Sequence, residues 1–141
     1  MEIEKVAILG LGTMGSGIAQ VCAQAGLDTV CFDVKQEFVD AGMARIQKNL
    51  DYGLKKGKFT EEHVQTTQSK LSTTTDLNTL TDVDLVIEAG IEDIAIKKQV
   101  FAQLDSVCPA HTLIASNTSS LSITDMATAT ERRIDIDAAR L

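Results

Sequence analysis

The stretch from Val6 to Leu27, VAILGLGTMGSGIAQVCAQAGL, carries no charge, and it restricts the possible folds of this chain more than any other feature. Its length would allow it to cross a membrane, since about 18 apolar residues suffice. However, four glycines fall within Gly10–Gly17, and glycine destabilises a helix interior. A compact apolar run followed by apolar residues at helical spacing predicts instead a strand, a tight turn and a helix that ends at Gly26. We therefore expect no membrane insertion.

The turn in this stretch, Gly10-Leu11-Gly12-Thr13-Met14-Gly15, fits the pattern G-x-G-x-x-G. It follows a predicted strand, opens a predicted helix, and precedes Asp33, which ends the next predicted strand. This context is typical of a dinucleotide-binding site. Gly10 permits the tight turn, Gly12 lets a pyrophosphate approach the backbone, and Gly15 lets helix and strand pack closely, while the helix N-terminus favours phosphate.

Asp33 indicates which dinucleotide binds. Its carboxylate would accept hydrogen bonds from ribose hydroxyls and repel a 2′-phosphate, which favours NAD over NADP. Lys35 would weaken that preference, but no arginine lies beside Asp33 in the sequence. Two alternatives stay open: an FAD site, and a glycine-rich turn that binds nothing.

Strand and helix patterns alternate along the rest of the chain, which predicts an α/β fold with a Rossmann-type, doubly wound parallel sheet. Strands are expected at about 4–9, 28–33, 71–75, 84–89 and 112–117, and helices at about 13–25, 39–54, from 60 onward and 93–107. A capping box at Ser122–Asp125 predicts a further helix. Between Asp33 and Asp84 the chain is much longer than the dozen or so residues that a crossover needs. We expect the excess to form a helical arm, about residues 35–70, that protrudes from the sheet.

Composition limits the possible partners. The net charge is −7 and no basic face is evident, which argues against a nucleic-acid partner. The three cysteines lie far apart and lack metal-ligand spacing, so we expect buried thiols in a cytoplasmic protein and no metal site. The first residues, MEIEKVAIL, do not resemble a secretory signal.

Two segments in the second half, DLVIEAGIEDIAIKKQVF and LIASNTSSLSIT, closely resemble the 3-hydroxyacyl-CoA dehydrogenases, and most of all the short bacterial 3-hydroxybutyryl-CoA dehydrogenases. GLGTMGSGIAQ and the KKGK run fit the same family, and the resemblance covers about residues 1–130. It implies oxidation of a short-chain (S)-3-hydroxyacyl-CoA, or reduction of the 3-ketoacyl-CoA, with NAD(H). Full-length members of this family are homodimers.

The resemblance also assigns roles to individual residues. Ser119 would hydrogen-bond the reacting oxygen of the acyl-CoA substrate beside the nicotinamide, and Asn117 would shape the same pocket. Glu92 and Lys97 would line the cofactor site near the nicotinamide ribose, with Ala89 in the same segment. Asn49 and Lys56 match positions on the helical arm that contact CoA.

Structural roles compete with some of these assignments. Lys97 suits a salt bridge, Lys56 suits a helix C-terminus, and Ser119 suits a helix cap, although Ser122 already serves that purpose. For Glu88 we expect a role in orienting the strand end rather than in chemistry.

The proton-accepting histidine of the family is missing from the sequence. Family members supply it from a His-Phe-Phe-Asn-Pro motif about twenty residues after SNTSS, whereas this chain reads ERRIDIDAARL after Thr130. We expect His63 and His111 to be surface residues without that role. The sequence thus predicts a truncated NAD-binding domain at 1–130, incomplete at its C-terminal end and without the helical C-terminal domain, followed by a non-family tail at 131–141.

Such a chain would bind NAD but turn over negligibly, and its sheet would end in an apolar edge. Two alternatives stay open: a non-catalytic module that binds NAD or CoA, and a 3-hydroxyisobutyrate-type dehydrogenase.

Overall fold

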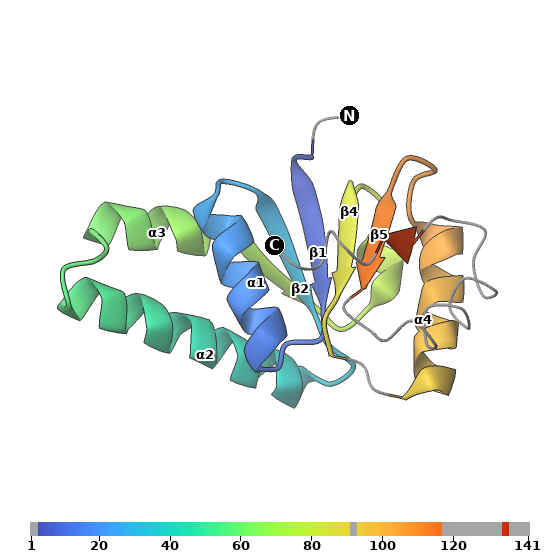
Figure 1. The fold of residues 1–141 in the computed structure, drawn as a ribbon, viewed down its shortest axis with the longest axis horizontal. Helices are drawn as coiled ribbons and strands as arrows, with labels where there is room; N and C mark the ends of the chain where they lie inside the picture. Colours follow the sequence, from blue (N-terminus) through green and yellow to red (C-terminus); the bar gives the residue numbers. More distant parts are fainter. Residues whose placement is uncertain (1–2, 91–92, 117–133, 136–141) are drawn as a thin grey trace.

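The computed structural model describes residues 3–90, 93–116 and 134–135, which form one parallel sheet with helices on both faces (Figure 1). The strand order is β3-β2-β1-β4-β5-β6, and every neighbouring pair is parallel. The strands are β1 (Lys5–Leu9), β2 (Asp28–Phe32), β3 (Leu71–Thr74), β4 (Leu85–Glu88), β5 (Leu113–Ser116) and β6 (Ile134–Asp135). The helices are α1 (Thr13–Gln24), α2 (Gln36–Lys55), α3 (Glu61–Ser69), the short 3-10 helix η1 (Leu77–Thr79) and α4 (Ile94–Val107).

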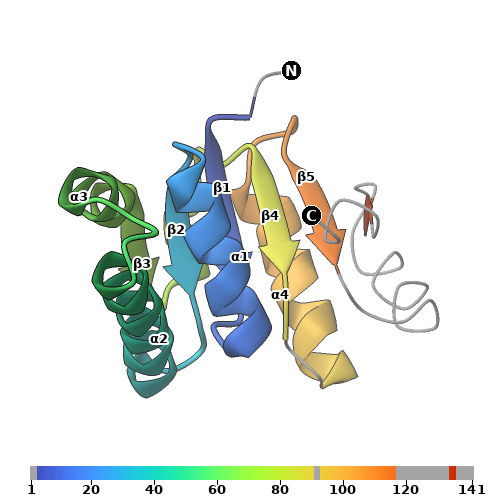
Figure 2. The same cartoon turned by 60° about the vertical axis from the view of Figure 1, so that its left-hand side comes forward.

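Successive residues of the central strand β1 enter two separate hydrophobic cores. Val6 and Ile8 pack with side chains from α1, α2 and α3, whereas Ala7 and Leu9 pack with side chains from η1 and α4. Figure 2 shows α1 and α4 on opposite sides of the sheet. Because both faces are covered, the central strands β1 and β4 are mostly continuous apolar runs rather than an alternating pattern. The predicted doubly wound sheet is confirmed.

The uncharged stretch forms β1, the glycine turn and α1, as predicted. Within the described ranges, no helix combines the length and the apolar character needed to span a bilayer.

Helices α2 and α3 form the expected helical arm, which extends away from the sheet in Figure 1. Val39, Ile46 and Leu50 bury one face of α2 in the core. The side chain of Thr60 accepts a hydrogen bond from the backbone N–H of His63 and so caps α3. The arm is therefore anchored to the sheet by apolar packing and has its own defined helix start.

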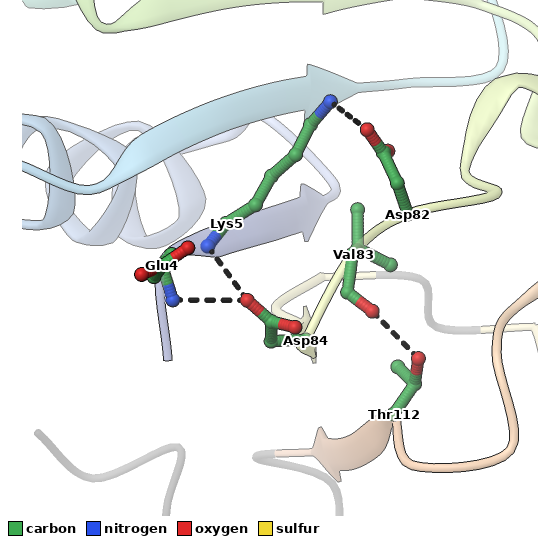
Figure 3. A network of polar contacts seen from close by, with 6 residues as sticks. All are labelled: Glu4, Lys5, Asp82, Val83, Asp84 and Thr112. Carbon is green, nitrogen blue, oxygen red and sulfur yellow. Dashed lines mark hydrogen bonds and ion pairs between the residues drawn. The ribbon is translucent and has the colours of Figure 1, made fainter. Parts of the chain in front are cut away.

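A polar network holds the amino ends of three strands together (Figure 3). Asp84 Oδ2 accepts hydrogen bonds from the backbone N–H groups of Glu4, at 2.9 Å, and Lys5, at 3.1 Å. The Thr112 hydroxyl donates to the Val83 carbonyl at 2.6 Å, which ties β5 to β4. His111 Nε2 lies 2.8 Å from Asp84 Oδ1 at the same amino edge, and this histidine is exposed, as predicted. These contacts lie at the edge opposite the glycine turn.

The structure adds two elements that the sequence analysis did not predict. Beyond residue 130 we expected no further strand, yet β6 pairs with β5 through the positions Ile114–Ile134 and Ala115–Asp135. Two residues of the predicted tail thus pair with the edge of β5, which corrects the expectation that this edge would be left open. The other addition is η1, whose Asp76 cap accepts a hydrogen bond from the Asn78 backbone N–H. The predicted helix at Ser122–Asp125 lies outside the described residues.

Candidate dinucleotide-binding site

The glycine turn joins β1 to α1 at the carboxyl edge of the sheet. Gly10 has a φ of +92°, which favours glycine, and its N–H donates to the Phe32 carbonyl at 2.9 Å. A Cβ on Gly15 would overlap the Gly10 carbonyl oxygen, whereas a Cβ on Gly12 would meet nothing within 4 Å. The glycines at 10 and 15 are therefore required by backbone packing, and Gly12 faces open space at the start of α1.

The first turn of α1 has the properties of a phosphate site. Gly12 is the N-cap of the helix, and no side chain caps it. The N-terminus of an uncapped helix combines backbone N–H donors with a partial positive charge, which favours phosphate groups.

Asp33 follows β2 and is oriented by two backbone donors. Its Oδ2 accepts a hydrogen bond from the Leu11 N–H at 2.9 Å, and its Oδ1 accepts one from the Val34 N–H at 2.7 Å. A carboxylate oxygen has two lone pairs, so each oxygen can still accept a hydroxyl donor. The contact with Leu11 fixes the predicted ribose acceptor directly to the glycine turn.

A pocket of about 260 Å³ opens between the glycine turn and the start of α4. Its lining combines backbone and polar groups with apolar side chains: Gly10, Leu11, Gly12, Asp33, Val34, Phe38, Gly90, Asp93 and Ile96. A second pocket, of about 350 Å³, shares Val34 and Ile96 with it and continues toward η1. A third, of about 280 Å³, shares Leu11, Gly12 and Asp33 and continues toward α2. Together they form a row along the carboxyl ends of the strands, where open α/β sheets bind ligands.

Arg45 enters this row from α2, which the sequence analysis did not anticipate. Its Nη1 donates to the Leu11 carbonyl at 2.9 Å, and Arg45 and Asp33 line the same third pocket. No arginine lies beside Asp33 in the sequence, but Arg45 lies beside the same pocket as Asp33 in the structure. Helical spacing could have revealed it, because Phe38, Ala41 and Arg45 lie three and four residues apart on one face of α2.

A second polar cluster connects the carboxyl ends of β4 and β5. Glu88 is fully buried; its Oε1 accepts a hydrogen bond from the Gly90 N–H at 3.0 Å, and its Oε2 accepts one from the Ser116 hydroxyl at 2.8 Å. Lys97 Nζ lies 3.6 Å from Glu88 Oε2, with 7% of the Lys97 side chain exposed. Glu88 thus orients the strand end, as expected. Lys97 forms a salt bridge, which is the structural role that we considered as the alternative to a contact with the cofactor.

The remaining predicted residues are distributed over several places. Ala89 is buried against the glycine turn, while the side chains of Thr13 and Met14 line a separate groove on α1. Asn49 is exposed on α2, and Lys56 at the end of that helix lies 5.7 Å from the centre of the Tyr52 ring. The predicted residues Glu92, Asn117 and Ser119 lie outside the described residues.

Neither histidine lies in the row of pockets. His63, on α3, stacks on Phe59 with ring centres 4.8 Å apart, and His111 belongs to the amino edge. In the described part of the chain, no group of three or more His, Cys, Asp or Glu side chains is placed to hold a metal ion. The cysteines Cys22, Cys31 and Cys108 are buried, as predicted.

The parallel sheet, the glycine turn and Asp33 together define a Rossmann-type dinucleotide-binding domain. The family model described as "3-hydroxyacyl-CoA dehydrogenase, NAD binding domain" matches residues 5–136. The chain belongs to this family, and NAD is its cofactor. The match extends beyond residue 130 and includes β6.

Known proteins from several bacteria are similar to the chain. The 3-hydroxybutyryl-CoA dehydrogenase of Clostridioides difficile is 44% identical over 128 residues, which are 91% of this chain and 46% of that protein. The 3-hydroxyadipyl-CoA dehydrogenase of Escherichia coli is 41% identical over 127 residues, which are 90% of this chain and 27% of that protein. The crystal structure of (S)-3-hydroxybutyryl-CoA dehydrogenase from Ralstonia eutropha has a TM-score of 0.85 at 40% identity, covering 93% of this chain and 46% of that one. The chain thus spans about half the length, or less, of the relatives it matches.

Proposed function

We propose that this chain provides the NAD-binding half of a 3-hydroxyacyl-CoA dehydrogenase that acts on short acyl chains such as 3-hydroxybutyryl-CoA. The observation that carries the proposal is the Asp33 carboxylate, held by the Leu11 and Val34 N–H groups beside an uncapped helix N-terminus. NAD, when bound, supplies the hydride acceptor. The chain's own part is to hold the two phosphates at the first turn of α1 and the adenosine ribose at Asp33.

The assignment of the acyl-CoA site rests on the resemblance. We propose that Ser119 donates a hydrogen bond to the reacting oxygen of the substrate and that Asn117 shapes this pocket. Asn49 and Lys56 would contact CoA from the helical arm. Support comes from the position of Ser116, which ends β5 at the same edge as the glycine turn and immediately precedes this segment.

Binding of NAD⁺ to the chain tests the cofactor part. Isothermal titration calorimetry should show saturable binding, and Asp33→Ala should weaken it about 10- to 100-fold because hydrogen bonds to a carboxylate are lost. Asp28→Ala is the matched control, since Asp28 starts the same strand at the opposite edge. Equal effects of the two substitutions would contradict the assignment of Asp33 to the ribose.

A chimera tests the dehydrogenase part. The segment of the Clostridioides difficile enzyme that has no counterpart here would follow residue 136, and NADH absorbance would be monitored with acetoacetyl-CoA. We expect turnover in the chimera and negligible turnover in the 141-residue chain, because the family's histidine motif is not among these residues. Ser119→Ala should lower the chimera's activity. A chimera that binds NADH but is inactive would favour the non-catalytic module.

We also propose a cytoplasmic location. It is supported by three buried cysteines that form no disulfide, as is usual for proteins in a reducing compartment. In a cell fractionation, recovery of the protein with membranes or in an oxidising compartment would contradict this location.

A further inference from the structure

Arg45 lies closer to the ribose acceptor than its place in the sequence indicates, because Gly42 brings α2 against the glycine turn. A Cβ on Gly42 would lie 2.5 Å from Leu11 Cβ, so any larger residue would push the helix away. Arg45 follows Gly42 by three residues, and its guanidinium reaches the Leu11 carbonyl. Leu11 is thus held from two sides, with its N–H on Asp33 and its carbonyl on Arg45.

Most N–H donors of the Arg45 guanidinium are available to a ligand. A guanidinium carries five N–H donors, and the described residues give Arg45 one hydrogen bond, from Nη1 to Leu11. The Leu11 carbonyl also accepts a hydrogen bond from the buried Ser16 hydroxyl at 2.9 Å. Leu11 therefore keeps a partner without Arg45, and the exposed arginine is not needed merely to satisfy that carbonyl.

Arg45 and Asp33 both line the pocket of about 280 Å³ that continues toward α2. Asp33 lines this pocket, so a ribose held by its carboxylate would lie in or beside the pocket, near Arg45. The carboxylate alone would repel a phosphate at that position, whereas a guanidinium attracts phosphate and can bind it through two parallel hydrogen bonds. The pocket thus contains a cation able to offset the repulsion from Asp33.

We propose that Arg45 binds the 2′-phosphate of NADP, so that this site accepts NADP as well as NAD. The inference rests on the proposed function, because it requires the adenosine ribose at Asp33. It changes the expectation drawn from Asp33 alone, since selectivity between the two dinucleotides then depends on a carboxylate after β2 and a guanidinium on α2.

The test compares the dissociation constants of NAD⁺ and NADP⁺ by isothermal titration calorimetry for the chain and two variants. Arg45→Gln removes the charge, and it should weaken NADP⁺ binding about tenfold or more, the usual effect of losing a charge-assisted hydrogen bond. Its NAD⁺ affinity should fall much less than its NADP⁺ affinity, so that the ratio of the two dissociation constants shifts toward NAD⁺ by about tenfold. Lys48→Gln removes an exposed charge three residues along the same helix, outside the pocket, and should change both affinities by no more than about twofold.

The other outcomes separate the two proposals. If the unmodified chain binds NAD⁺ but not NADP⁺, or if Arg45→Gln leaves NADP⁺ affinity unchanged, the role of Arg45 is overturned while the NAD site stands. An equal loss for both dinucleotides also overturns it, because Arg45 would then act on the glycine turn or the pyrophosphate. If the unmodified chain binds neither dinucleotide, the proposed function itself fails.

Arg45→Lys keeps the charge but loses the planar fork, and its NADP⁺ affinity should fall between those of the chain and Arg45→Gln.

Discussion

The Glu88 carboxylate accepts a hydrogen bond from the Ser116 hydroxyl at 2.8 Å, and this contact ties the carboxyl end of β4 to that of β5. The same carboxylate holds the Gly90 N–H and pairs with Lys97. These partners come from β5, from the loop after β4 and from α4, at the edge where the dinucleotide site lies. Glu88 therefore fixes the shape of that edge without reaching the pocket row itself.

Removing Glu88 should destabilise the chain more than removing both members of its ion pair. Glu88→Ala leaves the Lys97 ammonium without this partner in a buried position, which typically costs about 3–5 kcal/mol. Adding Lys97→Met removes the buried charge and should recover part of that loss. Urea unfolding of the two single variants and the double variant measures the coupling. Strictly additive effects would show that the pair does not interact.

Gly15 and Gly17 lie in the same helix and should respond oppositely to alanine. A Cβ on Gly15 would overlap the Gly10 carbonyl oxygen, so Gly15→Ala should lower the free energy of unfolding by about 1–3 kcal/mol and weaken NAD⁺ binding. A Cβ on Gly17 meets nothing within 4 Å. Gly17→Ala should therefore stabilise the chain by up to about 1 kcal/mol through helix propensity. Thermal unfolding of both variants distinguishes close packing from a general intolerance of alanine in α1.

Asp84 should make stability depend on pH in the acid range. Hydrogen bonds from the Glu4 N–H, the His111 side chain and the Lys5 N–H lower the pKa of Asp84 to about 2. Because its folded-state pKa lies below the unfolded value of about 3.9, its contribution is complete above that value and is lost as the pH falls toward 2. Urea midpoints measured from pH 6 to pH 2 should fall less steeply for Asp84→Asn below pH 4. Asp82→Asn, which changes an exposed side chain that pairs with Lys5, is the control.

Cys31 should resist thiol reagents in the folded chain. Burial, with a further contribution from the neighbouring Cys22, raises the pKa of the Cys31 thiol to about 12. Since the thiolate is the nucleophile, a disulfide reagent at pH 8 should modify Cys31 only after urea unfolds the chain. Val21→Cys introduces a thiol at an exposed position of α1 and should react at once. Rapid modification of Cys31 without denaturant would mean that the core opens far more readily than its packing indicates.

Local pattern was enough to predict the fold of the first half. The strand-turn-helix unit and the long helix follow from apolar spacing, which a chain keeps whatever its neighbours are, and their observed ends lie within a few residues of the predicted ones. The two-residue strand β6 has no such pattern, because its pairing depends on the edge of β5.

Parts of the site depend on contacts between distant residues and could not be predicted in the same way. Asp33 was evident from its distance to the glycine turn. The partners of Glu88 come from β5, α4 and the loop after β4, and Arg45 reaches Leu11 across 34 positions. No local spacing encodes contacts of this kind, since they arise only when helices pack on the sheet.

Asp84 and Glu88 are four residues apart, one just before β4 and one at its end, and each anchors a different edge of the sheet. A substitution at Asp84 affects folding alone, whereas one at Glu88 affects both folding and the geometry of the ligand site. An engineer can therefore raise thermal tolerance through the amino edge and redirect ligand choice through the carboxyl edge. A library that keeps β4 fixed and varies the two edges separately would change stability alone at the amino edge, and stability together with ligand choice at the carboxyl edge.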